Sequence, residues 1–218
     1  MGTDESMVRA TWRAGVVAGP AADEAWEGLT ARYREPHRTY HTLRHIAAVV
    51  TDVELLIAQE PAVADATAVR LAALYHDAVY DPRRADNEVA SAVLARRSLH
   101  PLGVGRPTLD RVEALIMATA GYTGPHHHGG DDRDTDVLVD ADLAVLGSEP
   151  AEYDAYVRGV RAEYGHLDDF TWRRGRASVL RAFLDRLVLY RTETMQRTHE
   201  HRARANMQAE LAAIEGSG

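Results

Sequence analysis

The sequence predicts an all-α protein, and three observations lead to this expectation. Apolar residues recur at helical spacing along most of the chain, and no alternating stretch of useful length predicts a strand. The helical segments end at proline or glycine, the residues that most often stop a helix. Neither a repeat nor a domain linker is visible in the 218 residues, a length that fits one domain. We therefore expect a single-domain helical bundle of about eight to nine helices.

The helices follow one another with short connections. In order, they are expected at Met7–Val17, Ala22–Arg34, Tyr40–Gln59, Ala64–Tyr80, Asp86–Ser98, Leu109–Ala120, Pro150–Tyr164, Phe170–Tyr190 and Thr194–Ile214. Within the single domain 1–218, residues 1–20 form an N-terminal helical extension. Residues 191–218 form an outer C-terminal helix that is rich in Arg and Glu.

Polar residues set the ends of the helices that matter most for function. Thr39 can cap the third helix, because threonine side chains accept hydrogen bonds from the free amides of a first turn. Asp81-Pro82 ends the fourth helix, since the residue before proline avoids the helical conformation. Asp86 then caps the fifth helix.

An imidazole and a carboxylate stand side by side at the end of the apolar fourth helix. His76 and Asp77 follow the run Leu71–Tyr75. An ionised carboxylate is costly to bury without a partner, so a buried pair of this kind is hydrogen-bonded, ion-paired or bound to a metal. A His-Asp dipeptide taken alone is more often a structural pair at a helix end. Other residues of the sequence must therefore show whether this pair binds a metal.

Two further histidines lie upstream, at the start of the third helix. His41 and His45 are four residues apart, which places them on one helical face with Arg44 beside them. We expect one of them to bind a metal and the other to hydrogen-bond to the core or face a phosphate group.

Four segments together resemble the HD superfamily of metal-dependent phosphohydrolases, in particular its predicted phosphohydrolases. They are Tyr-His-x-x-x-His-Ile at Tyr40–Ile46, His-Asp-x-x-Tyr-Asp at His76–Asp81, Asp-Asn-Glu-x-x-Ser-Ala at Asp86–Ala92 and Asp-x-Asp-Leu-x-x-Leu-Gly at Asp140–Gly147. Weaker similarity extends the resemblance from Trp26 to Leu211. Any one segment is a weak signal, whereas the four in this order are a strong one.

The resemblance implies a metal held by His41, His76, Asp77 and Asp142, which follow the superfamily order of His, His-Asp and Asp. The first ligand has two candidates. His-x-x-Arg segments of other HD proteins favour His41, whereas an alignment on the apolar residues that follow favours His45. We take His41 as the ligand and place His45 on the substrate side.

The chain contains no cysteine, so a metal must be held by histidines and carboxylates. Two nitrogen and two oxygen ligands suit a divalent ion such as Mn, Fe, Co, Ni, Zn or Mg. Such an ion polarises a phosphoryl oxygen and lowers the pKa of its water, so the resemblance implies phosphoester hydrolysis. All 25 basic residues are arginine, yet the net charge of −8 argues against a nucleic-acid polymer. We expect a small anionic phosphorylated substrate.

Residues near the four segments are candidates for the remaining roles. Substrate binding is assigned to Arg44, His45, Arg83, Arg84 and Asn87. Some HD hydrolases carry a glutamate three residues after the His-Asp pair, where this chain has Tyr80. Proton transfer is therefore assigned to Glu88 or Asp81. Asn87 and Glu88 could equally serve only the start of the fifth helix, and each of these arginines could be solvated surface.

Two other functions are compatible with the same residues. Some HD proteins hold two irons and oxidise organophosphonates with extra histidines, and His100 and His126–His128 fall in the corresponding interval. Related proteins tend to carry a histidine where this chain has Tyr122, so the three consecutive histidines either replace it or form a solvated tract. His100 precedes a proline and is explained more simply as a helix cap. A metal-stabilised binding or regulatory module without turnover is the third possibility.

The sequence contains no membrane-spanning signal. No apolar stretch approaches the roughly 18 residues that a helix needs to cross a bilayer. Charged residues interrupt Met1–Pro20, where a signal peptide would be apolar. We expect a cytoplasmic protein without a membrane partner, and the sequence leaves open whether it forms a homodimer.

Overall fold

The computed structural model describes residues 3–60, 62–120 and 132–216, and all regular secondary structure in this part of the chain is helical. Its first half contains α1 (Thr3–Gly15), α2 (Pro20–Arg32), α3 (Leu43–Gln59), α4 (Ala66–Tyr75), α5 (Asn87–Leu99), the 3-10 helix η1 (His100–Leu102) and α6 (Arg106–Thr119). Its second half contains α7 (Arg133–Leu143), the 3-10 helix η2 (Ala144–Gly147), α8 (Pro150–Glu163), α9 (Asp169–Leu184), α10 (Glu193–Thr198) and α11 (Glu200–Gly216).

These described ranges hold no strand, so the all-α prediction is confirmed. Eleven α-helices form instead of eight or nine for two reasons. Arg133–Leu143 is helical where only a polar segment and a turn were expected, and the last predicted helix is interrupted at His199. None of the described helices combines the length and apolarity that a bilayer crossing requires.

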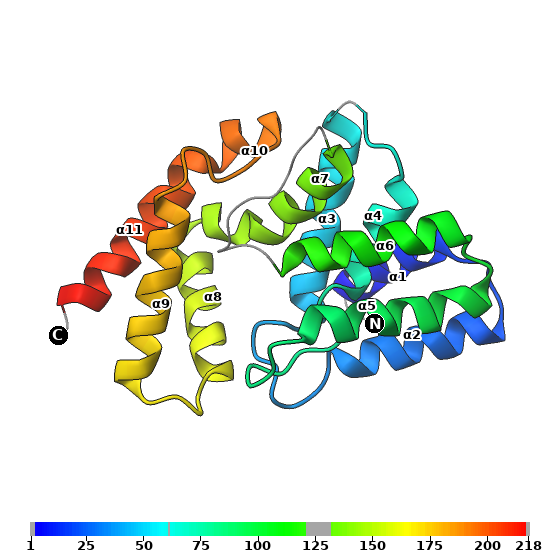
Figure 1. Cartoon of the computed structure of the whole chain (residues 1–218), viewed down its shortest axis with the longest axis horizontal. Coiled ribbons are helices and arrows are strands. Elements are labelled where there is room, and N and C mark those ends of the chain that lie inside the picture. Colours follow the sequence, from blue (N-terminus) through cyan, green and yellow to red (C-terminus); the bar gives the residue numbers. More distant parts are fainter. Residues whose placement is uncertain (1–2, 61, 121–131, 217–218) are drawn as a thin grey trace.

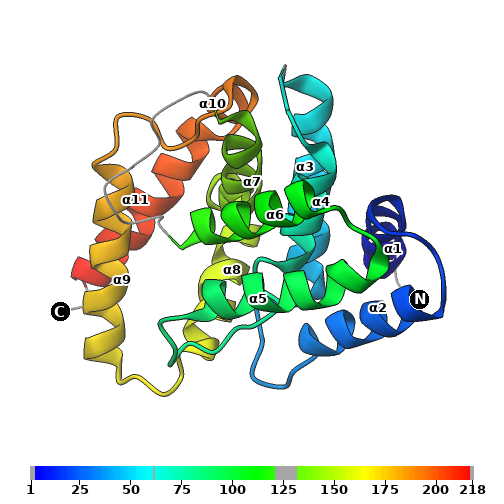
Figure 2. The ribbon, with the colours of Figure 1, turned by 45° about the vertical axis from the view of Figure 1, so that its right-hand side comes forward.

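The helices form two groups that meet at α3 and α7. In Figures 1 and 2, α1, α2, α5 and α6 lie toward the N-terminal end of the molecule, and α8, α9 and α11 lie side by side toward the C-terminal end. Helix α7 packs on α3, α4 and α6, and η2 continues from α7 to pack on α8 and α11. Residues from both groups can therefore meet where α3 and α7 adjoin.

Helix α4 is the centre of the first group. Ala68, Val69 and the run Leu71–Tyr75 are all buried, as the apolar sequence predicts. Helix α3 buries one stripe, from Ile46 through Val49, Val50 and Val53 to Leu56, which is the pattern of a helix with one face in the core. Because the last five residues of α4 are buried, the helix ends inside the molecule. His76, the next residue, is therefore buried as well.

Both helix ends nearest the site differ from the prediction. Helix α3 begins at Leu43 with Thr42 at its N-cap, so Thr39 is not the cap. Helix α4 ends at Tyr75 and not at Tyr80. In each case distant side chains satisfy the backbone groups that a longer helix would have paired. Asp86 does stand at the N-cap of α5, but its carboxylate binds Arg84 and not the helix amides.

Arg38 fixes the end of α4 relative to the segment before α3. Its guanidinium is inaccessible to solvent and donates hydrogen bonds to the carbonyl oxygens of His41 (3.0 Å), Asp77 (2.8 Å) and Ala78 (3.2 Å). A further bond, to the Glu35 carboxylate, compensates its charge. One side chain thus joins two segments that are nearly forty residues apart, and both carry candidate site residues.

A buried carboxylate fixes the segment before α10 in a similar way. Helix α9 stops at Leu184, short of the predicted Tyr190. Asp140 of α7 accepts hydrogen bonds from the backbone amides of Arg191 and Thr192 and from the Thr192 hydroxyl. This contact holds the connection between α9 and α10 against α7, two residues from Asp142.

Replacement of Arg38 by methionine should destabilise the protein strongly. The variant keeps the volume of the side chain but leaves three buried carbonyl groups without donors, which should lower the free energy of unfolding by about 3 kcal/mol or more. Urea unfolding measures the loss. Arg34→Met is the matched control, because Arg34 is more than half exposed and its pair with Glu5 should contribute about 1 kcal/mol or less. Equal losses in the two variants would contradict the assigned role of Arg38.

Candidate metal centre

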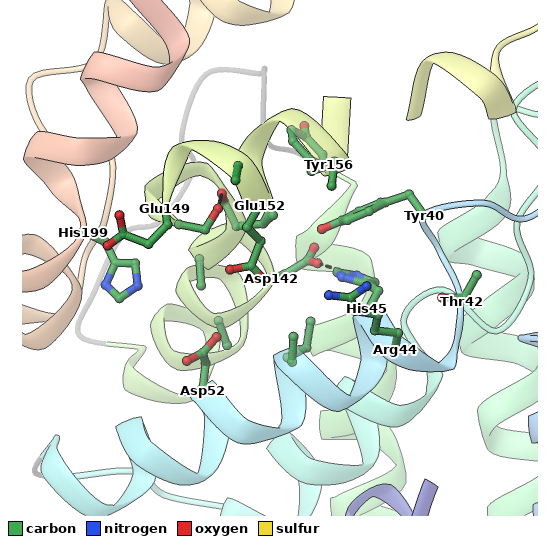
Figure 3. A pocket seen from close by; sticks show the side chains of 18 of the residues that line it. Tyr40, Thr42, Arg44, His45, Asp52, Asp142, Glu149, Glu152, Tyr156 and His199 are labelled. Carbon is green, nitrogen blue, oxygen red and sulfur yellow. Dashed lines mark hydrogen bonds and ion pairs between the residues drawn. The ribbon is translucent and has the colours of Figure 1, made fainter. Parts of the chain in front are cut away.

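Two cavities meet at the junction of α3, α7 and α8. The larger one has a volume of about 740 Å³ and is lined by α3, α7, α8, α11 and the segment before α3 (Figure 3). The smaller one has a volume of about 310 Å³ and is bordered by His41, Glu88 and Arg176. Asp142, Tyr40 and Tyr156 line both cavities, so Asp142 lies on the boundary between them.

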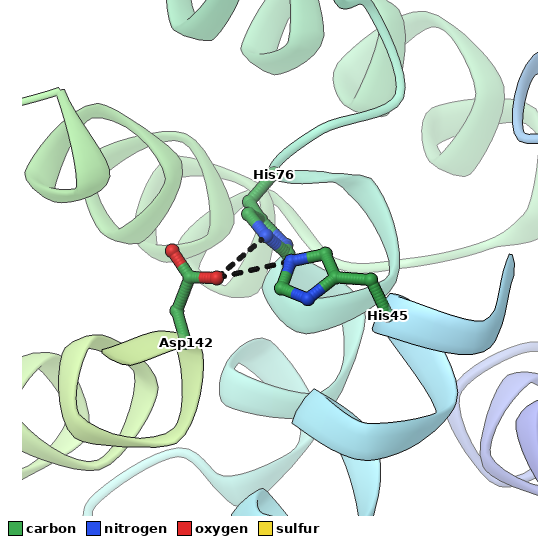
Figure 4. Close-up of side chains that lie close together, drawn as sticks. All are labelled: His45, His76 and Asp142. Carbon is green, nitrogen blue, oxygen red and sulfur yellow. Dashed lines mark ion pairs between the residues drawn. The ribbon is translucent and has the colours of Figure 1, made fainter. Parts of the chain in front are cut away.

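His45, His76 and Asp142 come together at this boundary (Figure 4). Asp142 Oδ1 lies 3.1 Å from His45 Nε2 and 3.4 Å from His76 Nε2. The carboxylate of Asp77 adds a second oxygen, with Oδ2 3.1 Å from His76 Nε2 and 3.5 Å from His45 Nε2. The four side chains come from the first turn of α3, the turn after α4 and the last turn of α7.

The histidine nitrogens are arranged as metal ligands are. His76 Nδ1 lies 3.0 Å from the carbonyl oxygen of Ala73, which can only accept, so Nδ1 carries a proton and Nε2 is the ring nitrogen left to face a metal. The Nε2 atoms of both His45 and His76 are buried and make no hydrogen bond. Unpaired buried polar atoms are rare and costly, and a divalent ion would satisfy both nitrogens together. His45, His76 and Asp142 could therefore hold a metal ion.

The electrostatics of the group keep its carboxylates ionised. Burial alone would raise the pKa of Asp142, but the neighbouring imidazoles of His76 and His45 outweigh it and hold the pKa well below its usual range. Burial likewise opposes the charged form of His76, and the adjacent carboxylates of Asp77 and Asp142 raise its pKa instead. Ionised carboxylates are the form in which these side chains bind metals.

His41 stands beside this group and not within it. Its Nε2 lies 4.0 Å from Asp77 Oδ2, and its Nδ1 lies 2.6 Å from Glu163 Oε2. His41 is the ligand expected from the likeness to His-x-x-Arg segments, and both candidates were considered on the premise that His41 and His45 share a helical face. That premise is wrong, because α3 begins at Leu43 and His41 precedes the helix. The structure places His45 in the position that the sequence analysis gave to His41.

Glu163 holds the segment before α3 in its irregular conformation. Its Oε1 accepts hydrogen bonds from the backbone amides of Thr39 (2.8 Å), Tyr40 (2.8 Å) and His41 (2.9 Å). Burial opposes the charge of Glu163, but the hydrogen bond with His41 and the amides outweighs it and lowers the pKa of this carboxyl to about 2. A permanently ionised carboxylate thus fixes the direction of the His41 ring.

Of the two candidates for proton transfer, Glu88 borders one of these two cavities and Asp81 borders neither. It is half-buried in the first turn of α5 and lines the smaller cavity with His41 and Asp142. The Asp81 carboxylate accepts a hydrogen bond from the backbone amide of Arg83, and Asp81 lines neither cavity. The amide group of Asn87 bonds to the backbone N–H and carbonyl of Asp81, so it supports the turn before α5.

The candidate arginines are placed differently from one another. Arg44 is exposed and lines the larger cavity next to His45. Arg83 and Arg84 are exposed and line neither of the two cavities, and Arg84 is paired with Asp86 at 2.9 Å. Of the three, Arg44 alone borders the candidate metal group.

Two important residues had no role in the sequence analysis. A usable signal existed for Glu163, because it continues the stripe Tyr153, Tyr156 and Val160 along α8, where an apolar residue would be expected. No comparable pattern marks Arg38. His126–His128 and Tyr122 lie outside the described residues. His100 is the exposed C-cap residue of α5, as expected for a helix cap, and it does not belong to the metal group.

No protein-family model, curated protein or solved structure matches the chain.

Replacement of Glu163 by glutamine should loosen the segment before α3. The amide keeps the shape but loses the charge that the His41 ring and three backbone amides share. We expect a loss of about 2 kcal/mol in the free energy of unfolding, or about 4–8 °C in Tm. Differential scanning calorimetry measures the shift. Asp154→Asn, on the exposed side of the same helix, is the control and should melt within about 2 °C of the parent. A parental Tm for the Gln variant would disprove the structural role of Glu163.

Proposed function

We propose that the protein is a metal-dependent phosphohydrolase of the HD type that cleaves a small phosphoester. The observation that supports this most strongly is the convergence of His45, His76, Asp77 and Asp142 in one group, in which the imidazoles are buried and the carboxylates only slightly exposed. Their order along the chain, His then His-Asp then Asp, is the ligand order of the HD superfamily. Three separated segments thus bring each of two imidazole nitrogens within 3.1–3.5 Å of two carboxylates.

His45, His76 and Asp142 would hold the metal, with Asp77 as the fourth ligand. Two nitrogen and two oxygen donors suit a divalent ion of the first transition series or Mg, and leave coordination positions for substrate and water. When bound, such an ion supplies a Lewis acid for the phosphoryl oxygen and lowers the pKa of water toward neutrality.

The remaining roles follow from the two cavities. The volume of about 740 Å³ is that of a typical small-molecule site, so the larger cavity is assigned to the substrate. Arg44 lies at its edge beside His45 and can bind phosphate oxygens. Glu88 borders the smaller cavity on the opposite side of Asp142, where it can accept a proton from water or return one to the leaving group.

A screen of metals and substrates tests this function. The apo protein is loaded with Mn, Fe, Co, Ni, Zn or Mg and assayed on nucleotides, phosphosugars and generic phosphoesters. One metal per chain and release of inorganic phosphate with at least one combination are expected. Metal binding without turnover on any phosphoester would favour a binding module. Two irons per chain with an optical band under anaerobic handling would instead favour an HD-type oxygenase.

One prediction of the proposed function concerns which histidine, His45 or His41, binds the metal. His45→Ala should lose the metal, because it removes one of the two unpaired buried nitrogens, whereas His41→Ala should retain about one metal per chain. The loss of a ligand should also remove the stabilisation that a bound ion gives the folded state, so only the first variant should lose its metal-dependent rise in Tm. Metal analysis of the purified variants decides. The opposite pattern would return the ligand role to His41.

The second prediction concerns proton transfer. Glu88→Gln keeps the size of the side chain and should lower turnover by on the order of 10²- to 10⁴-fold with metal content unchanged. Single-turnover kinetics on the best phosphoester measure the effect. Asp81→Asn is the matched control, because its carboxylate bonds to the loop backbone and lines neither cavity. If Glu88→Gln turns over normally and the control does not, the role belongs to Asp81.

A further inference from the structure

Two carboxylates that pair with no cation among the described residues line the larger cavity. Asp52 belongs to α3 and Glu152 to α8. Within the described residues, neither side chain makes a hydrogen bond or an ion pair. Figure 3 shows Asp52, Glu149 and His199 on one side of the cavity, with Tyr40, Thr42 and Arg44 on the other. The side of Asp52 is therefore acidic.

The basic residues of the cavity do not neutralise this acidic side. Arg202 is committed to Glu149 at 3.0 Å and to the carbonyl of Gly147. Burial and the nearby charge of Arg202 lower the pKa of His199, so its imidazole is neutral at pH 7. Arg44 lies beside His45, at the opposite side of the cavity.

The pKa of Asp52 is shifted in the direction expected for a carboxylate whose charge is not compensated. Burial, and next the charge of Glu152, raise the pKa of Asp52 to about 6. Two neighbouring carboxylates that repel each other are stabilised by any group that donates hydrogen bonds to both or carries a positive charge.

Helix α3 sets the distance between the metal group and the acidic side. His45 and Asp52 are seven residues apart, close to two full turns, so both side chains project from nearly the same face roughly 10 Å apart along the axis. Ala48 and Val49 line the cavity between them. Tyr40 and Tyr156, whose rings are 4.8 Å apart at 69°, border the same space. The cavity therefore offers a phosphoryl site beside aromatic rings and, two helical turns away, an acidic side.

We propose that the substrate is a phosphoester that carries an amino group roughly 10 Å from its phosphorus, the two-turn spacing of α3, and that Asp52 and Glu152 bind this amino group. The inference rests on the proposed function, because that function places the phosphoryl group at His45 and Asp142. A flexible alkyl ammonium group and the exocyclic amine of a nucleobase share the required chemistry.

Binding of non-hydrolysable phosphonates tests the inference without any turnover. Isothermal titration calorimetry on the metal-loaded protein compares an ω-aminohexyl phosphonate with its ω-hydroxyhexyl counterpart, and the phosphonate analogue of adenosine monophosphate with that of inosine monophosphate. In one pair or the other, the amino member should bind about tenfold more tightly than its partner. The pair that shows the preference identifies the source of the amine. An aminoethyl phosphonate, which is too short to span the cavity, should show no preference over its hydroxyethyl counterpart.

Two conservative variants test whether Asp52 and Glu152 cause the preference for the amino ligand. Asp52→Asn and Glu152→Gln should each reduce it to about threefold or less, because each removes one of the two charges. Glu54→Gln removes the same charge from the same helix outside the cavity, where Glu54 pairs with Arg70, and should leave the preference intact. Glu152 is exposed, so its variant remains informative if the Asp52 variant folds poorly.

The outcomes separate this inference from the proposed function. Equal binding of amino and hydroxyl members by the parent, no binding of any phosphonate, or an unchanged preference in both variants would overturn the inference. Hydrolysis of p-nitrophenyl phosphate, which carries no amine, reports on the proposed function independently. If the protein hydrolyses this ester but shows no preference for the amino ligands, the proposed function is supported and the proposed substrate class is contradicted.

Discussion

The rest of the structure depends on the convergence of two buried imidazoles and two largely buried carboxylates at one point. Burying these groups separately would be prohibitive, whereas together they compensate one another and offer two nitrogens and two oxygens to an ion. Each imidazole, of His45 and of His76, lies close to both carboxylates, of Asp77 and of Asp142, so no member of the group can be buried without the others. Three helix ends must converge to satisfy the group, and this requirement fixes how α3, α4 and α7 meet.

A second layer of charged side chains holds those helix ends in place. Arg38 binds the carbonyls of the turn that carries Asp77, and Glu163 binds the amides of the segment that carries His41. Both are almost completely buried and both bond mainly to backbone atoms. Because Glu163 belongs to α8, the C-terminal helices take part in shaping the site and in closing the larger cavity.

The sequence was sufficient for the fold class and for most of the candidate site. Helical periodicity predicts α3 and the buried α4 from local pattern alone, and the motifs single out His76, Asp77 and Asp142 without knowledge of the fold. The choice between His41 and His45 could not be made in this way. It depends on where α3 begins. The carboxylate of Glu163, 124 residues from Thr39 in the sequence, accepts hydrogen bonds from the amides before α3 and so helps to set where the helix starts. The early end of α4 has the same origin, because Arg38 binds carbonyls 39 and 40 residues further along the chain. Local sequence does not encode such contacts.

The central claim is that a divalent ion binds between His45, His76 and Asp142. Diffraction from crystals of the metal-loaded protein, recorded at the absorption edge of the ion, tests it most directly. The account predicts one anomalous peak within about 2.0–2.3 Å of the Nε2 atoms of His45 and His76 and of a carboxylate oxygen of Asp142. The peak should lie beyond coordination distance from His41. A peak coordinated by His41 and not by His45, or no peak between these residues in crystals shown to contain the metal, would contradict the account.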